Sequence, residues 1–182
     1  PCSAMRTNQL LSQRSNAWTV ILDMDQSGSM ADSVVYGAIC GSIFASLPAL
    51  NTHVVAFDTD VVDLSEQCGD DHVDMLFGVQ LGGGTDIAQA VQYAGELVEN
   101  PRRTIVVLIS DLYEGVSPGG VLRGAKALIE QGCRFLALCA LDDEASPAYD
   151  RDMGQKLADL GAFVGAMTPG ELAAFVAEAV NS

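Results

Sequence analysis

Short apolar runs alternate along this chain with segments of helical periodicity. Residues 18–24 are apolar on both faces except at Thr19 and Asp23, a pattern typical of a strand buried in a parallel sheet. Further strands are expected at residues 52–57, 103–110, 133–141 and 162–166. Residues 61–64 follow the second strand too closely for a crossover connection, so we expect them to pair antiparallel with it at an edge.

Helices are predicted between most of these strands. Residues 85–99 carry apolar side chains at helical spacing, with Thr85 or Gly84 as the N-cap. Residues 31–47 are expected to form a helix with one face made of Val35, Ile39, Ile43 and Leu47. Other helices are expected at residues 71–78, 121–130 (ended by Gly132), 150–160 and 169–180. This alternation predicts an α/β fold: an open, mostly parallel, doubly wound (Rossmann-like) sheet with one short antiparallel edge strand and helices on both faces.

The length of the chain fits a single domain. Its 182 residues are enough to bury a sizeable core. Residues 1–16 are polar and show no sustained period, so we interpret them as a tail or linker and residues 17–182 as the folded domain. Because the chain begins with Pro1 rather than Met, we expect it to be part of a longer protein. No apolar run reaches the length of a membrane span, so none is expected.

The charge is strongly negative and unevenly distributed. The net charge is -15, and no Lys or Arg occurs between Ser15 and Pro101. Such a field attracts cations and repels phosphate backbones, so nucleic acid is not expected as a partner. The five cysteines are odd in number and include no Cys-x-x-Cys pair. We expect reduced thiols in a cytoplasmic protein, with Cys40, Cys133 and Cys139 as small core residues.

Separate stretches of the chain carry oxygen-bearing side chains where strands end or helices begin. They are Asp25, Ser27 and Ser29 after the first strand, Thr85 in a glycine-rich loop before a helix, and Asp111 after strand 103–110. Open parallel sheets bind ligands at the carboxyl ends of their strands, and the strands that end at Asp25 and Asp111 are predicted to be neighbours. Hard oxygen ligands of this kind predict Mg²⁺, Mn²⁺ or Ca²⁺ rather than zinc.

The order of these motifs resembles that of the von Willebrand factor A (VWA) domain family, over residues 17–180. The resemblance implies a metal-ion-dependent adhesion site (MIDAS) made of Asp25, Ser27, Ser29, Thr85 and Asp111. In the family, a divalent ion in this site binds an acidic side chain of a partner protein, which implies a protein-binding module and not an enzyme. Bacterial and cytosolic members often work beside an AAA-type ATPase, as in the metal chelatases, so the resemblance implies such a partner. An extracellular adhesion role is the alternative within the family.

A second resemblance implies an enzyme. Residues 23–27 are similar to the Asp-x-Asp-x-Thr start of haloacid-dehalogenase-type phosphatases, in which the first Asp is the nucleophile and the second a general acid beside Mg²⁺. Asp23 and Asp25 would take these roles. Ser110 would correspond to the phosphate-binding hydroxyl of these enzymes, Lys126 to their Lys, and Asp142 and Asp143 to their acidic pair. This interpretation leaves Ser29 and Thr85 without a role, so we keep it as the alternative.

Some acids near the motifs have structural interpretations. Asp86 is expected to interact favourably with the dipole of the helix that follows it. Asp58 is expected to stabilise a turn over residues 58–60, and the alternative is a place at the rim of the site. Asp23 interrupts an apolar strand, so it is either a hydrogen-bonded buried acid or lies where the sheet is open.

Overall fold

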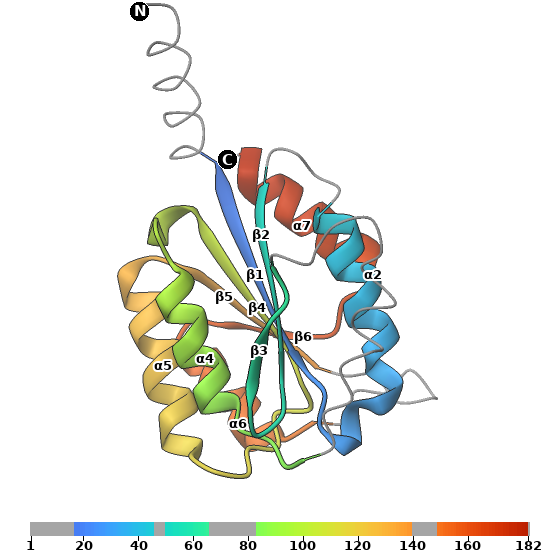
Figure 1. Cartoon of the computed structure of the whole chain (residues 1–182). Coiled ribbons are helices and arrows are strands. Elements are labelled where there is room, and N and C mark those ends of the chain that lie inside the picture. Colours follow the sequence, from blue (N-terminus) through green and yellow to red (C-terminus); the bar gives the residue numbers. More distant parts are fainter. Residues whose placement is uncertain (1–16, 46–49, 66–82, 140–148, 182) are drawn as a thin grey trace, which may run out of the picture.

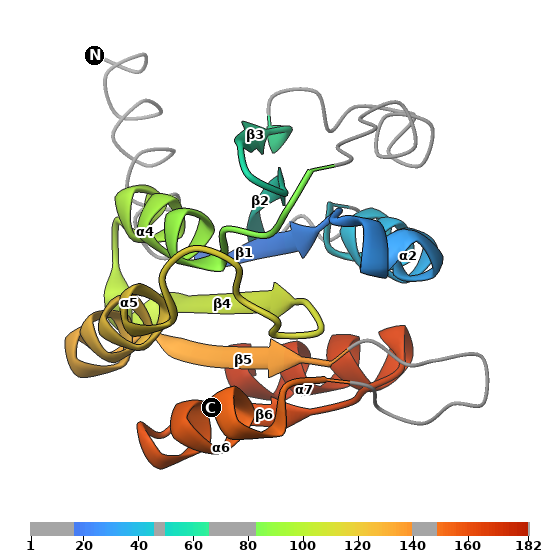
Figure 2. The same ribbon diagram turned by 90° about the horizontal axis from the view of Figure 1, so that it is seen from below.

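A computed structural model of the chain is shown in Figure 1 and, turned by 90°, in Figure 2; the structure describes residues 17–45, 50–65, 83–139 and 149–181. They form a six-stranded sheet in the order β3-β2-β1-β4-β5-β6. Its strands are β1 (Trp18–Asp25), β2 (Leu50–Phe57), β3 (Val61–Asp63), β4 (Thr104–Ile109), β5 (Arg134–Leu138) and β6 (Phe163–Gly165). Neighbouring strands are parallel except β2 and β3. The predicted fold class and the antiparallel edge strand are therefore confirmed.

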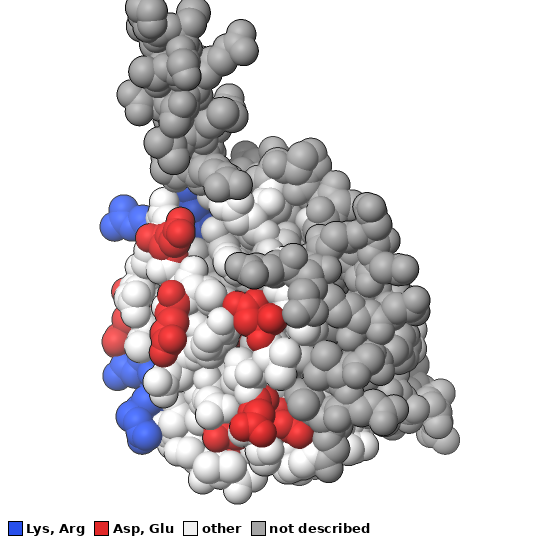
Figure 3. All heavy atoms as spheres, in the orientation of Figure 1, with Lys and Arg blue, Asp and Glu red and all other residues white. Residues whose placement is uncertain are grey.

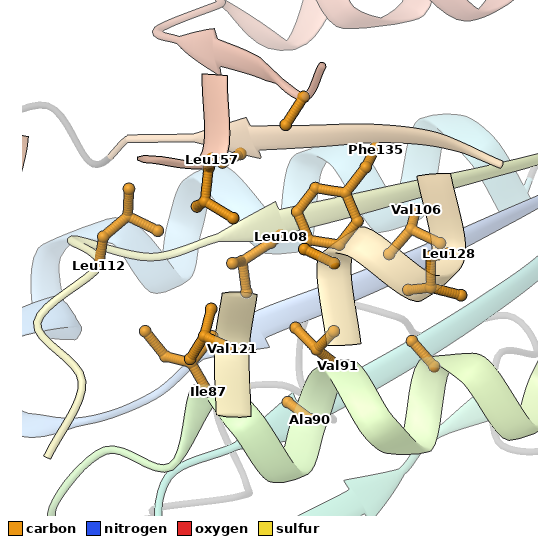
Figure 4. Close-up of a cluster of buried hydrophobic side chains, with 14 of the residues drawn as sticks. Ile87, Ala90, Val91, Val106, Leu108, Leu112, Val121, Leu128, Phe135 and Leu157 are labelled. Carbon is orange, nitrogen blue, oxygen red and sulfur yellow. The ribbon is translucent and has the colours of Figure 1, made fainter. Parts of the chain in front are cut away.

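Helices cover both faces of the sheet. They are α2 (Val34–Ala45), α4 (Ile87–Leu97), α5 (Pro118–Gln131), α6 (Arg151–Asp159) and α7 (Pro169–Asn181), with 3₁₀ turns η1 (Gly28–Ser33) and η3 (Pro101–Arg103). The core side of α2 and α7 packs on one face, and that of α4, α5 and α6 on the other (Figures 1 and 2). Figure 4 shows the cluster of buried side chains between the sheet and helices α4, α5 and α6, in which Ile87 and Val91 of α4 meet Leu108 of β4. The helix predicted at residues 71–78 lies outside the described residues.

The start of α4 differs from the prediction. Asp86 is the N-cap, because its Oδ1 accepts a hydrogen bond from the Gln89 N–H at 3.0 Å. Thr85, one of the two residues predicted for this role, instead belongs to the preceding loop, where its carbonyl accepts from the Gly115 N–H. The prediction of Thr85 or Gly84 was wrong because backbone hydrogen bonds to Gly115 and Asp58 hold this loop, and α4 begins only after Asp86. Gly132, which ends α5 with a positive φ of 106°, was predicted correctly.

The apolar stripe predicted on α2 is not the face that packs on the sheet. Val35 and Ile39 are 49% and 42% exposed, and Leu47 lies outside the described residues. The helix packs through a face that includes Gly37, Ala38, Cys40 and Phe44, and a Cβ added at Gly37 would lie 2.6 Å from the Met24 sulfur. Because α2 is apolar all round, periodicity could not select the buried face, and the close approach to β1 did.

Three of the cysteines were predicted to be small core residues. Cys40, Cys133 and Cys139 are free and buried, as predicted. Within the described ranges no helix is both long and apolar enough to cross a membrane. Cys2 and Cys68 lie outside these ranges.

Candidate metal site at the carboxyl edge of the sheet

The predicted neighbours Asp25 and Asp111 do lie side by side in the fold. Asp25 is the last residue of β1, and Asp111 follows the end of β4, the strand paired in parallel with β1. The strand order changes direction between these two strands, since β2 lies on one side of β1 and β4 on the other. This is where open α/β sheets place their ligands. Both residues are buried, with 2% and 6% of their surface exposed.

Asp25 is fixed by hydrogen bonds to both of its carboxylate oxygens. Oδ1 accepts from the Ser27 N–H at 2.9 Å, and Oδ2 accepts from the Ser110 hydroxyl at 2.6 Å. Burial raises the pKa of Asp25, the hydrogen bonds from Ser110 and Ser27 oppose this, and the nearby charge of Asp111 adds to it, so the pKa stays above its usual range. A cation between the two carboxylates would relieve both the burial cost and the repulsion.

The serines place two hydroxyl groups together at the start of η1. The Oγ atoms of Ser27 and Ser29 are 3.3 Å apart. Ser27 is 4% exposed, whereas Ser29 faces solvent. The chain turns at once after Ser27, whose carbonyl accepts from the Met30 N–H at 2.9 Å. A donor set that runs from a buried to an exposed oxygen is thus formed within one short loop.

The loop that carries Thr85 spans the ends of the two strands beside β1. On the β2 side, the Gly83 N–H donates to Asp58 Oδ2 at 3.0 Å and the Asp86 N–H donates to the Asp58 carbonyl at 2.7 Å. On the β4 side, the Gly115 N–H donates to the Thr85 carbonyl at 3.0 Å. Half-buried Thr85 therefore lies at the same edge as Asp25.

The predicted site residues are joined to different degrees. Hydrogen bonds join Asp25 to Ser27 and Ser27 to Ser29, and the charge of Asp111 acts on Asp25. Thr85 is held by its backbone and makes no side-chain hydrogen bond to the other four, all of which are described. Among the described residues no three His, Cys, Asp or Glu side chains form a metal-binding group. A metal here would therefore depend on hydroxyl ligands as well as carboxylates.

Asp58 has both the predicted turn role and a second one. Its Oδ1 accepts from the Asp60 N–H at 2.8 Å, which confirms the turn, while its Oδ2 holds Gly83. Burial raises the pKa of Asp58, but the hydrogen bonds from Asp60, Gly83 and Thr59 outweigh it and leave the pKa below its usual value.

Two supporting residues were not found by sequence reasoning. Ser110 was considered only as a phosphate ligand, yet its hydroxyl donates to Asp25 and accepts from the Leu112 N–H at 3.0 Å. Glu114 accepts from the N–H groups of Ala88, Val116 and Ser117 with its two oxygens. It thereby stabilises the N-terminal ends of both α4 and α5, which favour negative charge. Ser110 could have been indicated by its place just after the strand predicted to lie beside the one that ends at Asp25. Nothing local indicates Glu114.

Asp23 fits neither expectation for it. It is 0% exposed in the middle of β1, paired with Val55 of β2 and Leu108 of β4, so the sheet is not open there. Neither carboxylate oxygen has a hydrogen-bond partner among the described residues. Burial raises its pKa well above the usual value. A nucleophile must reach its substrate, and this side chain cannot do so without the sheet opening.

Comparison with known proteins agrees with this architecture. The chain is 46% identical over 177 residues to the uncharacterized protein YehP of Escherichia coli; the aligned part is 97% of this chain and 47% of YehP, so the chain spans about half of that relative. An aerotolerance-related membrane protein from Bacteroides fragilis superposes with a TM-score of 0.66 at 16% identity (91% of this chain, 99% of that one).

A second solved structure has the same fold. The von Willebrand factor type A protein from Catenulispora acidiphila superposes with a TM-score of 0.65 at 18% identity, covering 90% of this chain and 42% of that one. The family model described as "VWA domain containing CoxE-like protein" matches residues 4–176, a range that begins within the predicted tail. Residues 1–16 are not described, so that boundary stays a prediction. The chain belongs to the family of VWA domains of the CoxE-like type.

Proposed function

We propose that this VWA domain is a divalent-metal-dependent protein-binding module. The observation that carries the proposal is the pair of buried carboxylates, Asp25 and Asp111, close enough for the charge of one to act on the other. Two buried acids side by side are costly unless a cation balances them.

The donor set suits a hard cation. Asp25, Ser27, Ser29, Thr85 and Asp111 present only oxygen, which is the preference of Mg²⁺ and also of Mn²⁺ and Ca²⁺. When bound, the ion would supply a positive charge and an exchangeable coordination position at an otherwise acidic edge. Asp25 is prepared for this role because Ser27 and Ser110 fix both of its oxygens.

The proposed partner group is a carboxylate on another protein. VWA domains mediate protein interactions, and an acidic side chain would complete the shell of the ion. We propose an AAA-type ATPase as the partner and the cytoplasm as the location, by analogy with bacterial and cytosolic family members. Nothing in the described part of the chain favours the phosphatase: Asp23 is inaccessible, Ser110 is engaged by Asp25, and Lys126 lies 3.7 Å from Glu130 on the exposed side of α5. Asp142 and Asp143 lie outside the described residues.

Binding of a candidate AAA-type ATPase, measured by titration calorimetry in Mg²⁺ and in chelator, tests the proposal. Chelator should abolish binding and added Mg²⁺ or Mn²⁺ should restore it. Replacing both Ser27 and Ser29 by Ala should also abolish it, while Ser42→Ala, which removes a hydroxyl bonded within α2, should not. Equal affinity with and without metal would rule out the metal bridge.

A further inference from the structure

The loop between β4 and α5 exposes two large apolar side chains beside the proposed metal site. Tyr113 is 58% and Val116 is 62% exposed, and these are the highest values among the large hydrophobic residues in the described part of the chain. Tyr113 lies two residues after Asp111. Exposed apolar side chains that gather beside a binding site indicate a contact surface.

This loop is held in place on both sides. The Tyr113 N–H donates to Asp111 Oδ1 at 3.1 Å, and the Gly115 N–H donates to the Thr85 carbonyl. Glu114 adds bonds from Val116 at 2.7 Å and from Ala88 of α4 at 3.2 Å. Because the backbone is already ordered, a partner that binds these side chains does not bear the entropy cost of fixing it.

The backbone conformation at Leu112 also indicates that this loop is fixed. Its φ is +62°, a left-handed conformation that is strained for a residue with a branched side chain. The Leu112 side chain is completely buried, in the cluster with Leu108 and Leu157 (Figure 4). Packing and the bond to Ser110 therefore impose a turn that leaves Tyr113 in solvent.

Val116 also lies at the mouth of a groove between α4 and α5. The groove has a volume of about 690 Å³, and its lining includes Asp86 and Ser117 at the site end. Its walls combine small residues, such as Ala88 and Gly120, with the longer side chains of Gln89, Gln92 and Arg123. A bulky side chain that reached this mouth would contact Val116 and extend into the groove.

The charges around the site restrict what can bind there. The described segments from β1 to α4 contain no Lys or Arg, and exposed Asp60 and half-buried Asp86 lie at this edge. In the view of Figure 3, acidic side chains lie on the left and in the centre of the described surface, and basic ones only on its left side. Arg123 lines the groove between α4 and α5, so an acidic segment is repelled mainly on the side of the site formed by β1 to α4. On that side the carboxylate bound to the ion needs support from uncharged contacts.

We infer that Tyr113 and Val116 form an apolar platform that selects the partner. The occupant is a protein segment with one Asp or Glu for the ion, a bulky apolar side chain at a fixed distance from it for the platform, and no second acid on the side that faces β1 to α4. This inference rests on the proposed metal-dependent function and adds a specificity element to it.

Selection from a displayed library of random 12-residue peptides, in Mg²⁺ and in chelator, tests the inference. Metal-dependent binders should carry an acidic residue and, at a fixed offset, Leu, Ile, Met, Phe or Trp. Selection on the Tyr113→Ser/Val116→Ser protein should keep the acid and lose the apolar preference. Phe163→Ser, which removes an exposed aromatic at the amino end of β6, is the control and should change neither.

The same peptides, made by synthesis, should bind the double variant roughly fivefold or more weakly than the wild type in Mg²⁺. Metal-dependent binders without an apolar preference, or with one that survives in the double variant, would overturn the platform and leave the metal site standing. If the selection yielded no peptide whose binding depends on metal, both the platform and the proposed metal site would be overturned. Loss of a Mg²⁺-dependent wild-type dimer in the double variant would place a second copy there and also contradict the inference.

Discussion

Replacing Asp23 by Leu should stabilise the protein. Both side chains branch at Cγ, so the change keeps the shape while removing a carboxyl group that is 0% exposed and has no hydrogen-bond partner among the described residues. Burying such a group without a partner costs about 1–3 kcal/mol. The two methyl groups of the new Leu are larger than the carboxylate oxygens that they replace beside Val55 and Leu108. They will therefore offset part of the stabilisation, since overpacking a core costs about 1–3 kcal/mol.

The gain from Asp23→Leu should also grow with pH. Because the folded-state pKa of Asp23 is raised, the native protein keeps a proton that the unfolded chain loses above about pH 3.9. Wild-type stability therefore falls by about 1.4 kcal/mol per pH unit, relative to the variant, from that pH up to the folded-state pKa. At pH 4 the free energy of unfolding of the variant exceeds that of the wild type only by the cost of burying a neutral, unpaired carboxyl group.

Urea unfolding between pH 4 and pH 8 in chelator, followed by circular dichroism and by the fluorescence of Trp18, the single tryptophan, measures this difference. Asp23→Asn is the matched control, because it removes the ionisable group but keeps an unpaired polar group. Its stability relative to the wild type should therefore rise with pH, without the additional stabilisation that Leu gives by removing the polar group. If neither Asp23→Leu nor Asp23→Asn gained stability relative to the wild type as the pH rises, the raised pKa of Asp23 and this reasoning would be wrong.

Two further predictions concern other contacts. Gly124→Ala should destabilise the protein by about 1–3 kcal/mol in thermal unfolding, because the new Cβ would lie 2.8 Å from Val91 Cγ1 between α5 and α4. Gly170→Ala on α7, where the Cβ meets nothing within 4 Å, should instead stabilise it by about 0.5–1 kcal/mol, and equal effects would refute the packing argument. Asp58→Asn should cost about 1 kcal/mol at pH 7. Since its folded-state pKa is lowered, this difference should shrink as the pH falls below about 4, and a constant difference in urea unfolding would show that the charge is not involved.

The sheet could be predicted from the sequence because its strands are unambiguous. The run ending at Asp25 is apolar on both faces, and the short connection before Val61 allows only an antiparallel edge. Helix α2 shows the limit of this approach: its sequence is apolar all round, and the buried face was decided by the approach of Gly37 to Met24. A tertiary constraint of this kind leaves no periodic signal.

The site could be predicted only in part for the same reason. Asp25, Ser27 and Ser29 are neighbours in sequence, so their proximity follows from one loop. Glu114 contacts Ala88 across 26 residues of sequence, and such a bond depends on how α4 and α5 pack. Local patterns therefore identify candidate ligands, whereas the groups that hold their loops together emerge only from the fold.

Paramagnetic Mn²⁺ offers the most direct measurement of the proposed metal site. In an amide-resolved NMR spectrum, sub-stoichiometric Mn²⁺ should broaden the resonances of Ser27, Ser29, Thr85 and Asp111 while those of Thr104 and Arg134, at the amino ends of β4 and β5, stay sharp. Excess Mg²⁺ should restore the lost signals, and the Ser27→Ala/Ser29→Ala protein should show no selective broadening. Broadening spread over the exposed acids, or unchanged in that double variant, would contradict a metal ion at the carboxyl edge of the sheet.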